Sequence, residues 1–154
     1  MNSPKRSPKR SVARSAARLA AVQALYQKDM EGTPLPKLLN EFHQHRLGQE
    51  VEDEQYAEAE TDFFDDIVKG VDARRGEIDA AIEARLASGW SLKRLDKAML
   101  QILRCGTYEL LARADIPVGA AISEYVDVAK AFFDDRDAKF VNGLLDGVAK
   151  DVRA

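Results

Sequence analysis

The sequence predicts an all-α protein of about seven helices. Apolar residues recur at three- and four-residue spacing through most of the chain, and the period-two alternation of strands is absent. Threonine, which favours strands, occurs only three times, whereas alanine, the strongest helix former, is abundant. The length of 154 residues suits one domain, and a single cysteine excludes an internal disulfide. These observations predict a packed helical domain that needs no covalent cross-links.

A basic arm, residues 1–10, is expected to be disordered. It consists largely of two Ser-Pro-Lys-Arg units, whose prolines and charges disfavour a packed structure. The first 18 residues hold six basic side chains and no acidic one, whereas the remainder holds 17 basic and 26 acidic residues. A basic segment on an acidic body predicts a polyanion site at this end of the chain. Residues 11–154 are expected to form a single helical domain.

Two helices are predicted before an acidic segment, 48–60, that is expected to be a loop. The first, 11–30, carries an apparent core stripe that includes Tyr26 and Met30. The run Gly32-Thr33-Pro34 ends this helix and begins the next, 34–46. Glycine favours the residue just after a helix, threonine is a good N-cap, and proline fits the first turn.

Five further helices are predicted from single apolar stripes, and their ranges are 57–73, 75–87, 92–113, 118–132 and 138–150. Ser91 is the expected N-cap of the helix at 92–113, because Gly89 and Trp90 before it predict a turn. Pro117 separates the predicted helices 92–113 and 118–132, since the residue before a proline disfavours the helical conformation. The residues from Asp134 to Asp137 are expected to form a turn before the last helix. One apolar face on each helix predicts a bundle.

The sequence gives no support for catalysis or for a bound metal or cofactor. His43 and His45 are two residues apart, so on a helix they point about 200° apart and cannot share a metal on one face. Cys105 lies among apolar residues, which predicts a packing role. Adjacent carboxylates occur in polar runs, whereas acid–base catalysis needs a carboxyl group in a dry pocket. We therefore expect a non-enzymatic protein.

The most informative polar pattern lies near the N-terminus. Arg10, Arg14 and Arg18 form a row with a spacing of four, and the same row continues through Val22 to Tyr26. Each step of four residues rotates the row by about 40° around the helix axis. The row should therefore begin as exposed cations and reach the apolar stripe near Tyr26. Arginines beside an aromatic ring are typical of sites for single-stranded nucleic acid. The residues alone leave open that Tyr26 is a core residue and that the arginines only aid solubility.

A second candidate is the segment that opens the last predicted helix. A helix N-terminus presents free backbone N–H groups to an anion, and here Lys139 would add charge and Phe140 a ring. The alternative is that Phe140 belongs to the core, whose spacing it shares. Asn142 is unusual within a helix, and we hypothesise a buried hydrogen bond to Glu124. Gly143 and Gly147 suggest a close helix crossing.

An ordered series of segments resembles the NusB transcription antitermination factors. The segments are Arg14 to Gln27, Trp90 to Leu95, Ile102 to Arg104, Tyr108 to Leu110, Ile116-Pro117, Ile122 to Val126, Ala129-Lys130 and Phe140 to Asp146. Each segment alone is a weak signal, but their order is specific, and together they cover residues from about 11 to 150.

The resemblance implies two packed helical subdomains and a cytoplasmic RNA-binding protein. It implies binding to the boxA segment of nascent ribosomal RNA, together with NusE, the small-subunit ribosomal protein, on RNA polymerase antitermination complexes. The residues it implies at the RNA surface are Arg14, Arg18, Tyr26, Lys139 and Phe140. Arg136 and Lys93 stand where the best-known members carry acids, so both add positive charge near the expected RNA surface. We include Arg136 among the candidate RNA-binding residues.

Two other functions remain open. A protein–protein scaffold could use the basic arm to bind acidic partners or an anionic membrane, although no apolar run approaches the roughly 20 residues that span a bilayer. The RNA-binding domain of a methyltransferase that shares this fold is a further alternative, but these residues include no catalytic domain.

Overall fold

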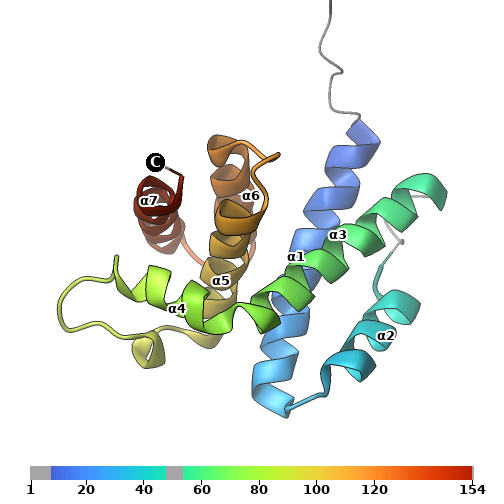
Figure 1. The fold of residues 1–154 in the computed structure, drawn as a ribbon, viewed down its shortest axis with the longest axis horizontal. Coiled ribbons are helices and arrows are strands. Elements are labelled where there is room, and N and C mark those ends of the chain that lie inside the picture. The colour runs from blue at the N-terminus through green and yellow to red at the C-terminus, as the bar shows by residue number, and fades with distance from the viewer. Residues whose placement is uncertain (1–7, 48–53, 154) are drawn as a thin grey trace, which may run out of the picture. The chain divides into compact units, whose positions relative to one another are not determined.

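The computed structural model describes residues 8–47 and 54–153 (Figure 1). Within these residues it contains seven α-helices, one short 3₁₀ helix and no strand, which confirms the all-α prediction. The helices are α1 (Pro8–Glu31), α2 (Leu35–His45), α3 (Glu54–Ala73), α4 (Arg75–Glu83), η1 (Leu92–Arg94), α5 (Lys97–Ala112), α6 (Val118–Phe132) and α7 (Asp135–Val152). The chain divides into two compact units, Met1–Asp66 and Ile67–Ala154, with the boundary inside α3.

Three helices begin earlier than the sequence predicts, and one of them, α7, begins at Asp135 inside the segment expected to be a turn. Helix α1 begins at Pro8, so the last three residues of the expected disordered arm are helical. Residues 1–7 of that arm lie outside the described residues. Helix α3 begins at Glu54, inside the segment expected to be a loop, and residues 48–53 of that segment also lie outside the described residues.

In the first unit, small residues form the buried face of α1. Ala13, Ala17, Ala21 and Ala24 are fully buried, as is most of Leu25. The predicted core stripe is wrong at its C-terminal end, where Tyr26 and Met30 are exposed. Alanines allow a neighbouring helix to approach closely, so the buried face of this helix follows its small residues and not Tyr26 or Met30.

Aromatic residues fill the space between α2 and the first part of α3. The ring of Phe42 stacks on that of Phe64 with centroids 5.4 Å apart, and both side chains are buried. The turn that leads from α1 into α2 uses Gly32 at a φ of 71°, a conformation that glycine adopts without steric cost. This turn confirms the predicted role of Gly32.

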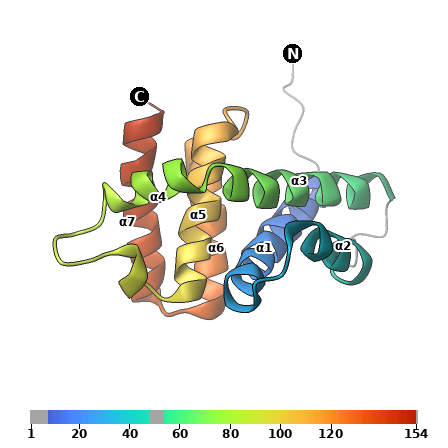
Figure 2. The same ribbon diagram turned by 60° about the horizontal axis from the view of Figure 1, so that its bottom comes forward.

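In the second unit, α5 is the central helix. Figures 1 and 2 show α5, α6 and α7 side by side, with α4 crossing α5. Every residue of α5 from Met99 to Leu110 is buried. The buried Tyr125 of α6 donates its hydroxyl hydrogen bond to the buried carboxylate of Glu109 on α5. A polar pair inside the core is thereby satisfied.

Close packing in this unit requires glycine at Gly70 rather than at Gly143. A Cβ atom on Gly70 would overlap the ring of Tyr108, whereas Gly143 faces open space. A Cβ on Gly147 would lie 2.9 Å from the side chain of Arg85. The predicted helix crossing at Gly143 and Gly147 is therefore wrong, because Gly147 accommodates a flexible side chain and not a helix backbone.

The helix ends in the second unit depend on side-chain caps that the sequence analysis misplaced. Asp96, not Ser91, is the N-cap of α5, and its carboxylate accepts hydrogen bonds from the N–H groups of Ala98 and Met99 at 2.8 and 3.1 Å. Ser91 instead precedes the 3₁₀ helix η1. Asp134 caps α7 in the same way, by accepting a hydrogen bond from the N–H of Asp137 at 3.0 Å.

Arg153 satisfies the carbonyl groups at the other end of α5. Its guanidinium donates hydrogen bonds to the backbone oxygens of Leu110, Ile116, Glu109 and Arg113, at 2.9, 2.6, 3.1 and 2.6 Å. The last carbonyls of a helix lack intrahelical partners, and a cation there also interacts favourably with the helix dipole. Arg153 therefore joins the end of α7 to the end of α5.

Candidate nucleic-acid interface

The arginine row on α1 crosses the buried face of the helix instead of ending there. Arg10 is exposed, Arg14 is half-buried, and Arg18 and Val22 are buried. Tyr26 then emerges with 41% of its surface exposed. Four steps of about 40° rotate the row by about 160°, which is enough to enter and leave the core. The expected exposure of Arg18 is therefore wrong, and Tyr26 is not a core residue.

The ring of Phe63 on α3 contacts both Arg14 and the buried Arg18. The guanidinium carbon of Arg18 lies 4.9 Å from the centroid of the Phe63 ring, and that of Arg14 lies 5.0 Å from it. A guanidinium near an aromatic ring is attracted by the ring's electrons, most strongly where water is excluded. Arg18 is fully buried, so this contact holds α1 against α3 within the first unit. We define the α1 surface as Arg10, Arg14 and Tyr26, the members of the row that reach solvent.

The second predicted segment lies one turn inside α7. The helix begins at Asp135, so Lys139 and Phe140 are in its second turn, and both are exposed. The helix N-terminus is capped by Asp134, and its first turn contains Asp135 and Asp137. The expectation that residues 138–143 open the helix is therefore wrong, and the helix N-terminus carries Asp134, Asp135 and Asp137 instead of Lys139 and Phe140.

The exposure of Phe140 and of Asn142 tests two of the expectations for α7. Phe140 is 38% exposed, which places its ring at the surface rather than in the core. Asn142 is also exposed, so the hypothesised buried hydrogen bond to Glu124 is wrong. Arg136 is exposed in the first turn of the helix. We define the α7 surface as Arg136, Lys139 and Phe140.

The α7 surface borders a groove of about 700 Å³, which we call the Trp90 groove. It is lined by Leu86, Ala87, Trp90, Arg94, Leu95, Asp96, Met99, Phe133, Arg136, Asp137 and Phe140. The sequence analysis did not assign Trp90 or Arg94 to a site. The sequence feature that could have indicated this site is Trp90 itself. It is the only tryptophan of the chain, and it lies in a polar turn where few apolar residues can cover its ring.

The turn that carries Trp90 is fixed by two hydrogen bonds. The backbone N–H of Trp90 donates to the backbone carbonyl of Ala87 at 3.0 Å, and Arg94 Nη1 donates to the backbone carbonyl of Gly89 at 2.6 Å. Gly89 adopts a φ of 87°, which a residue with a side chain rarely does. The same Arg94 guanidinium lies 5.5 Å from the Trp90 ring centroid. Trp90 is nevertheless 55% exposed, so the turn holds the ring at the surface.

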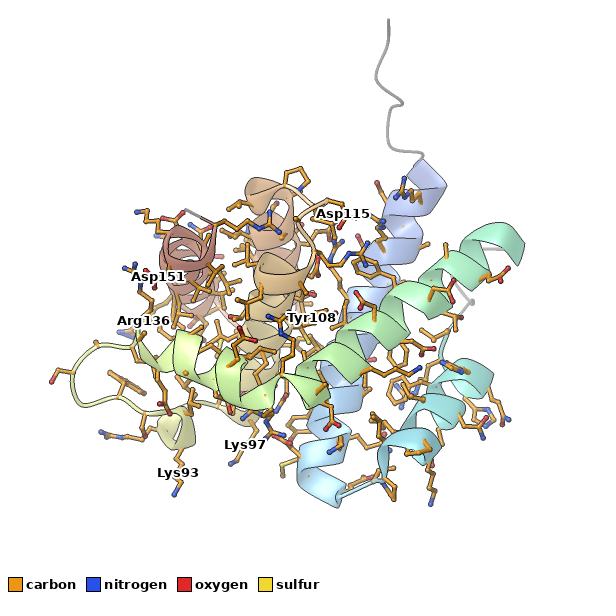
Figure 3. All side chains as sticks on the ribbon, viewed as in Figure 1. Lys93, Lys97, Tyr108, Asp115, Arg136 and Asp151 are labelled. Carbon is orange, nitrogen blue, oxygen red and sulfur yellow. The ribbon has the colours of Figure 1, made fainter. Side chains whose placement is uncertain are left out.

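Charges of both signs line the groove. Arg94 and Arg136 contribute cations, while the Asp96 carboxylate is used as the cap of α5. Burial raises the pKa of Asp137, and the nearby Asp134 raises it further. Lys93 on η1 and Lys97 at the start of α5 are exposed, and Figure 3 shows Lys93 projecting away from the ribbon. The lining therefore holds two cations and two carboxylates, and the exposed Lys93 and Lys97 lie next to lining residues in the sequence.

The remaining candidate residues have structural roles. Cys105 is fully buried, and burial raises the pKa of its thiol, which fits the predicted packing role. His43 Nε2 lies 2.6 Å from Asp65 Oδ1, with its ring edge against Phe64. Across the described residues, no group of three or more metal-ligating side chains is placed to hold a metal. No helix in the described part of the chain is long and apolar enough to cross a membrane.

Comparison with known proteins gives one consistent result. Residues 15–150 match the model of the NusB family. The transcription antitermination protein NusB of Novosphingobium aromaticivorans is 72% identical over 132 residues, which cover 86% of this chain and 89% of that protein.

Two solved structures extend the likeness to the fold. T. maritima NusB superposes with a TM-score of 0.72 at 32% identity, covering 94% of this chain and 92% of that one. A crystal structure of the antitermination factors NusB and NusE in complex with dsRNA superposes with a TM-score of 0.74 at 27% identity, covering 91% of this chain and 98% of that one. Sequence identity and helical arrangement thus agree over nearly the whole length, and the chain belongs to the NusB family.

Proposed function

We propose that this protein is a transcription antitermination factor that binds the boxA segment of nascent ribosomal RNA together with NusE. It acts in the cytoplasm as an adaptor on RNA polymerase complexes, not as an enzyme. The observation that carries the proposal is the family match over residues 15–150, with a 72% identical relative named as an antitermination protein. The related structure of NusB and NusE with dsRNA supports NusE and RNA as partners.

Single-stranded RNA is the form of boxA that the two surfaces suit. Tyr26 and Phe140 are exposed rings, and a base can stack on such a ring only when it is unpaired. Arg10 and Arg14 on the α1 surface, and Arg136 and Lys139 on the α7 surface, would contact phosphates. Phosphate contacts should supply most of the affinity, and contacts with bases should supply the sequence preference.

The first test is assembly. The full chain should co-purify with NusE, and fluorescence anisotropy should show that the complex prefers single-stranded boxA RNA over a scrambled strand and over the boxA duplex. No complex with NusE and no preference for boxA would contradict the proposal. Displacement of bound RNA by anionic vesicles would instead favour the scaffold alternative.

Salt dependence tests which cations contact phosphates. The logarithm of the binding constant should fall linearly with the logarithm of salt concentration, and each lost phosphate contact should flatten the slope by about 0.7 for single strands. We expect that flattening for Arg14→Ala and for Lys139→Ala. Lys150→Ala is the matched control, because Lys150 is exposed on the same helix as Lys139 but eleven residues further along. Unchanged slopes in both variants would exclude these residues from the RNA surface.

A further inference from the structure

We propose that the Trp90 groove is a nucleobase pocket, in which one unpaired base of bound RNA stacks on Trp90 while Arg136 contacts the adjoining phosphate. This inference rests on the proposed function, because it assigns a base-binding site to an RNA-binding protein. It adds Trp90 as a stacking residue and Arg94 as a positioning residue, and neither belongs to the α1 or the α7 surface.

The Trp90 ring is exposed on a turn whose backbone is held by hydrogen bonds. A large apolar ring that is 55% exposed leaves favourable burial unused, which a stacked base would recover. The hydrogen bonds of the turn fix the backbone that carries the ring, and the guanidinium of Arg94 lies 5.5 Å from the ring centroid before any ligand arrives. Binding then requires little additional ordering of the protein, which favours affinity. With Arg94 near the ring, a base can add to an existing cation–aromatic pair.

The shape and lining of the groove suit a flat aromatic ligand. Its volume of about 700 Å³ falls within the roughly 300–1,000 Å³ of small-molecule pockets. Leu95 and Met99 are buried residues of the lining, and Phe133 and Phe140 add further aromatic surface. Apolar faces with a few polar groups at the edge are what a base requires, since its faces are apolar and its edges form hydrogen bonds.

Charge complementarity favours RNA over an apolar protein segment as the occupant. Arg94 and Arg136 line the groove together with Asp96 and Asp137, and the bordering elements carry the exposed Lys93, Lys139 and Asp135. Of the two carboxylates in the lining, Asp96 is engaged by the N–H groups of α5. Asp137 remains as an acceptor for an amino group on a base edge. A nucleotide offers a phosphate to Arg136 and hydrogen-bonding groups to Asp137, whereas an apolar segment would bury both charges without compensation.

The test uses Trp90 as its own reporter, because the chain has no other tryptophan. Single-stranded boxA RNA, titrated into the full chain, should quench tryptophan fluorescence and protect it from acrylamide. In parallel anisotropy titrations, Trp90→Ala should weaken RNA binding by roughly 5- to 150-fold, the measured range for one base–aromatic stack. Trp90→Phe retains a ring and should remain within about threefold of the original affinity. Phe132→Ala removes an exposed ring outside the groove lining and should leave affinity unchanged.

The outcomes separate this inference from the proposed function. If the chain binds boxA RNA but its fluorescence does not change and Trp90→Ala retains full affinity, the groove is not a base pocket and the proposed function stands. If no boxA binding occurs with or without NusE, both fail. If NusE alone changes the Trp90 signal and RNA does not, the groove is a protein-docking site and the inference is overturned. Should Trp90→Ala fail to fold, the quenching and acrylamide titrations of the unaltered chain still decide the outcome, because they need no variant.

Discussion

Arg18 shows how a cation at a predicted binding position can belong to the core. It is fully buried against the ring of Phe63, while Arg14, one turn earlier, is half-buried against the same ring. The residue type and the spacing of four are identical for the two arginines. Only the rotation of the row relative to α3 separates them, and a single sequence does not specify that rotation.

Replacing Arg18 should therefore reduce stability more than it reduces intrinsic RNA affinity. Arg18→Ala removes a buried guanidinium–ring contact and leaves a cavity, so we expect a loss of about 2 kcal/mol or more in the free energy of unfolding. Urea denaturation followed by circular dichroism measures this loss. Arg14→Ala is the matched control and should lower RNA affinity with a smaller loss of stability. Equal stability losses in both variants would contradict the distinction drawn between them.

The helices themselves were predictable because each carries a single apolar stripe. The α6 boundaries, Val118–Phe132, agree with the predicted 118–132. Capping was less predictable, because several residues near a helix start can serve as N-cap. Ser91 and Asp96 are both suitable types, and the selection of Asp96 follows from the path of the chain through η1. Helix α4 ends at Glu83, four residues before the predicted end. The predicted range is too long because the apolar stripe of the helix continues into the turn that follows it.

Arg153 is the element-scale feature that no local pattern indicates, since its partners lie about 40 residues away. Hydrogen bonds from a charged donor contribute about 1.5–3 kcal/mol each when buried, and those of Arg153 are part-buried and share one side chain. We expect Arg153→Ala to lower the free energy of unfolding by about 2 kcal/mol or more, as measured by thermal or urea denaturation.

Arg113→Ala is the control for this prediction. Arg113 forms an exposed ion pair with Asp115 in the same region, and such pairs contribute about 0–1 kcal/mol. Its backbone carbonyl still accepts the Arg153 hydrogen bond after the substitution. If Arg153→Ala were no more destabilising than Arg113→Ala, the capping role of Arg153 would be wrong.

At the scale of the whole molecule, the two candidate RNA surfaces belong to different compact units. The α1 surface lies in Met1–Asp66, and the α7 surface and the Trp90 groove lie in Ile67–Ala154. Sequence reasoning found members of both surfaces, because cations and exposed rings are local features. The groove was not predicted, because Trp90 before η1, Phe133 just after α6 and Phe140 in α7 come together only in the folded unit.

Two surfaces on one chain predict a characteristic dependence on RNA length. A strand that reaches both surfaces converts the second contact into an intramolecular event, so affinity should rise stepwise by a factor of roughly 10² or more at a threshold length. Anisotropy titrations with single-stranded RNA of increasing length around boxA would locate this step. The double variant Arg14→Ala with Tyr26→Ala should remove the step while leaving the affinity of shorter strands at the α7 surface unchanged. If the affinity instead rises smoothly with RNA length, and does so in the double variant as well, one strand does not contact both the α1 surface and the α7 surface. Recognition of boxA would then depend on the second unit alone.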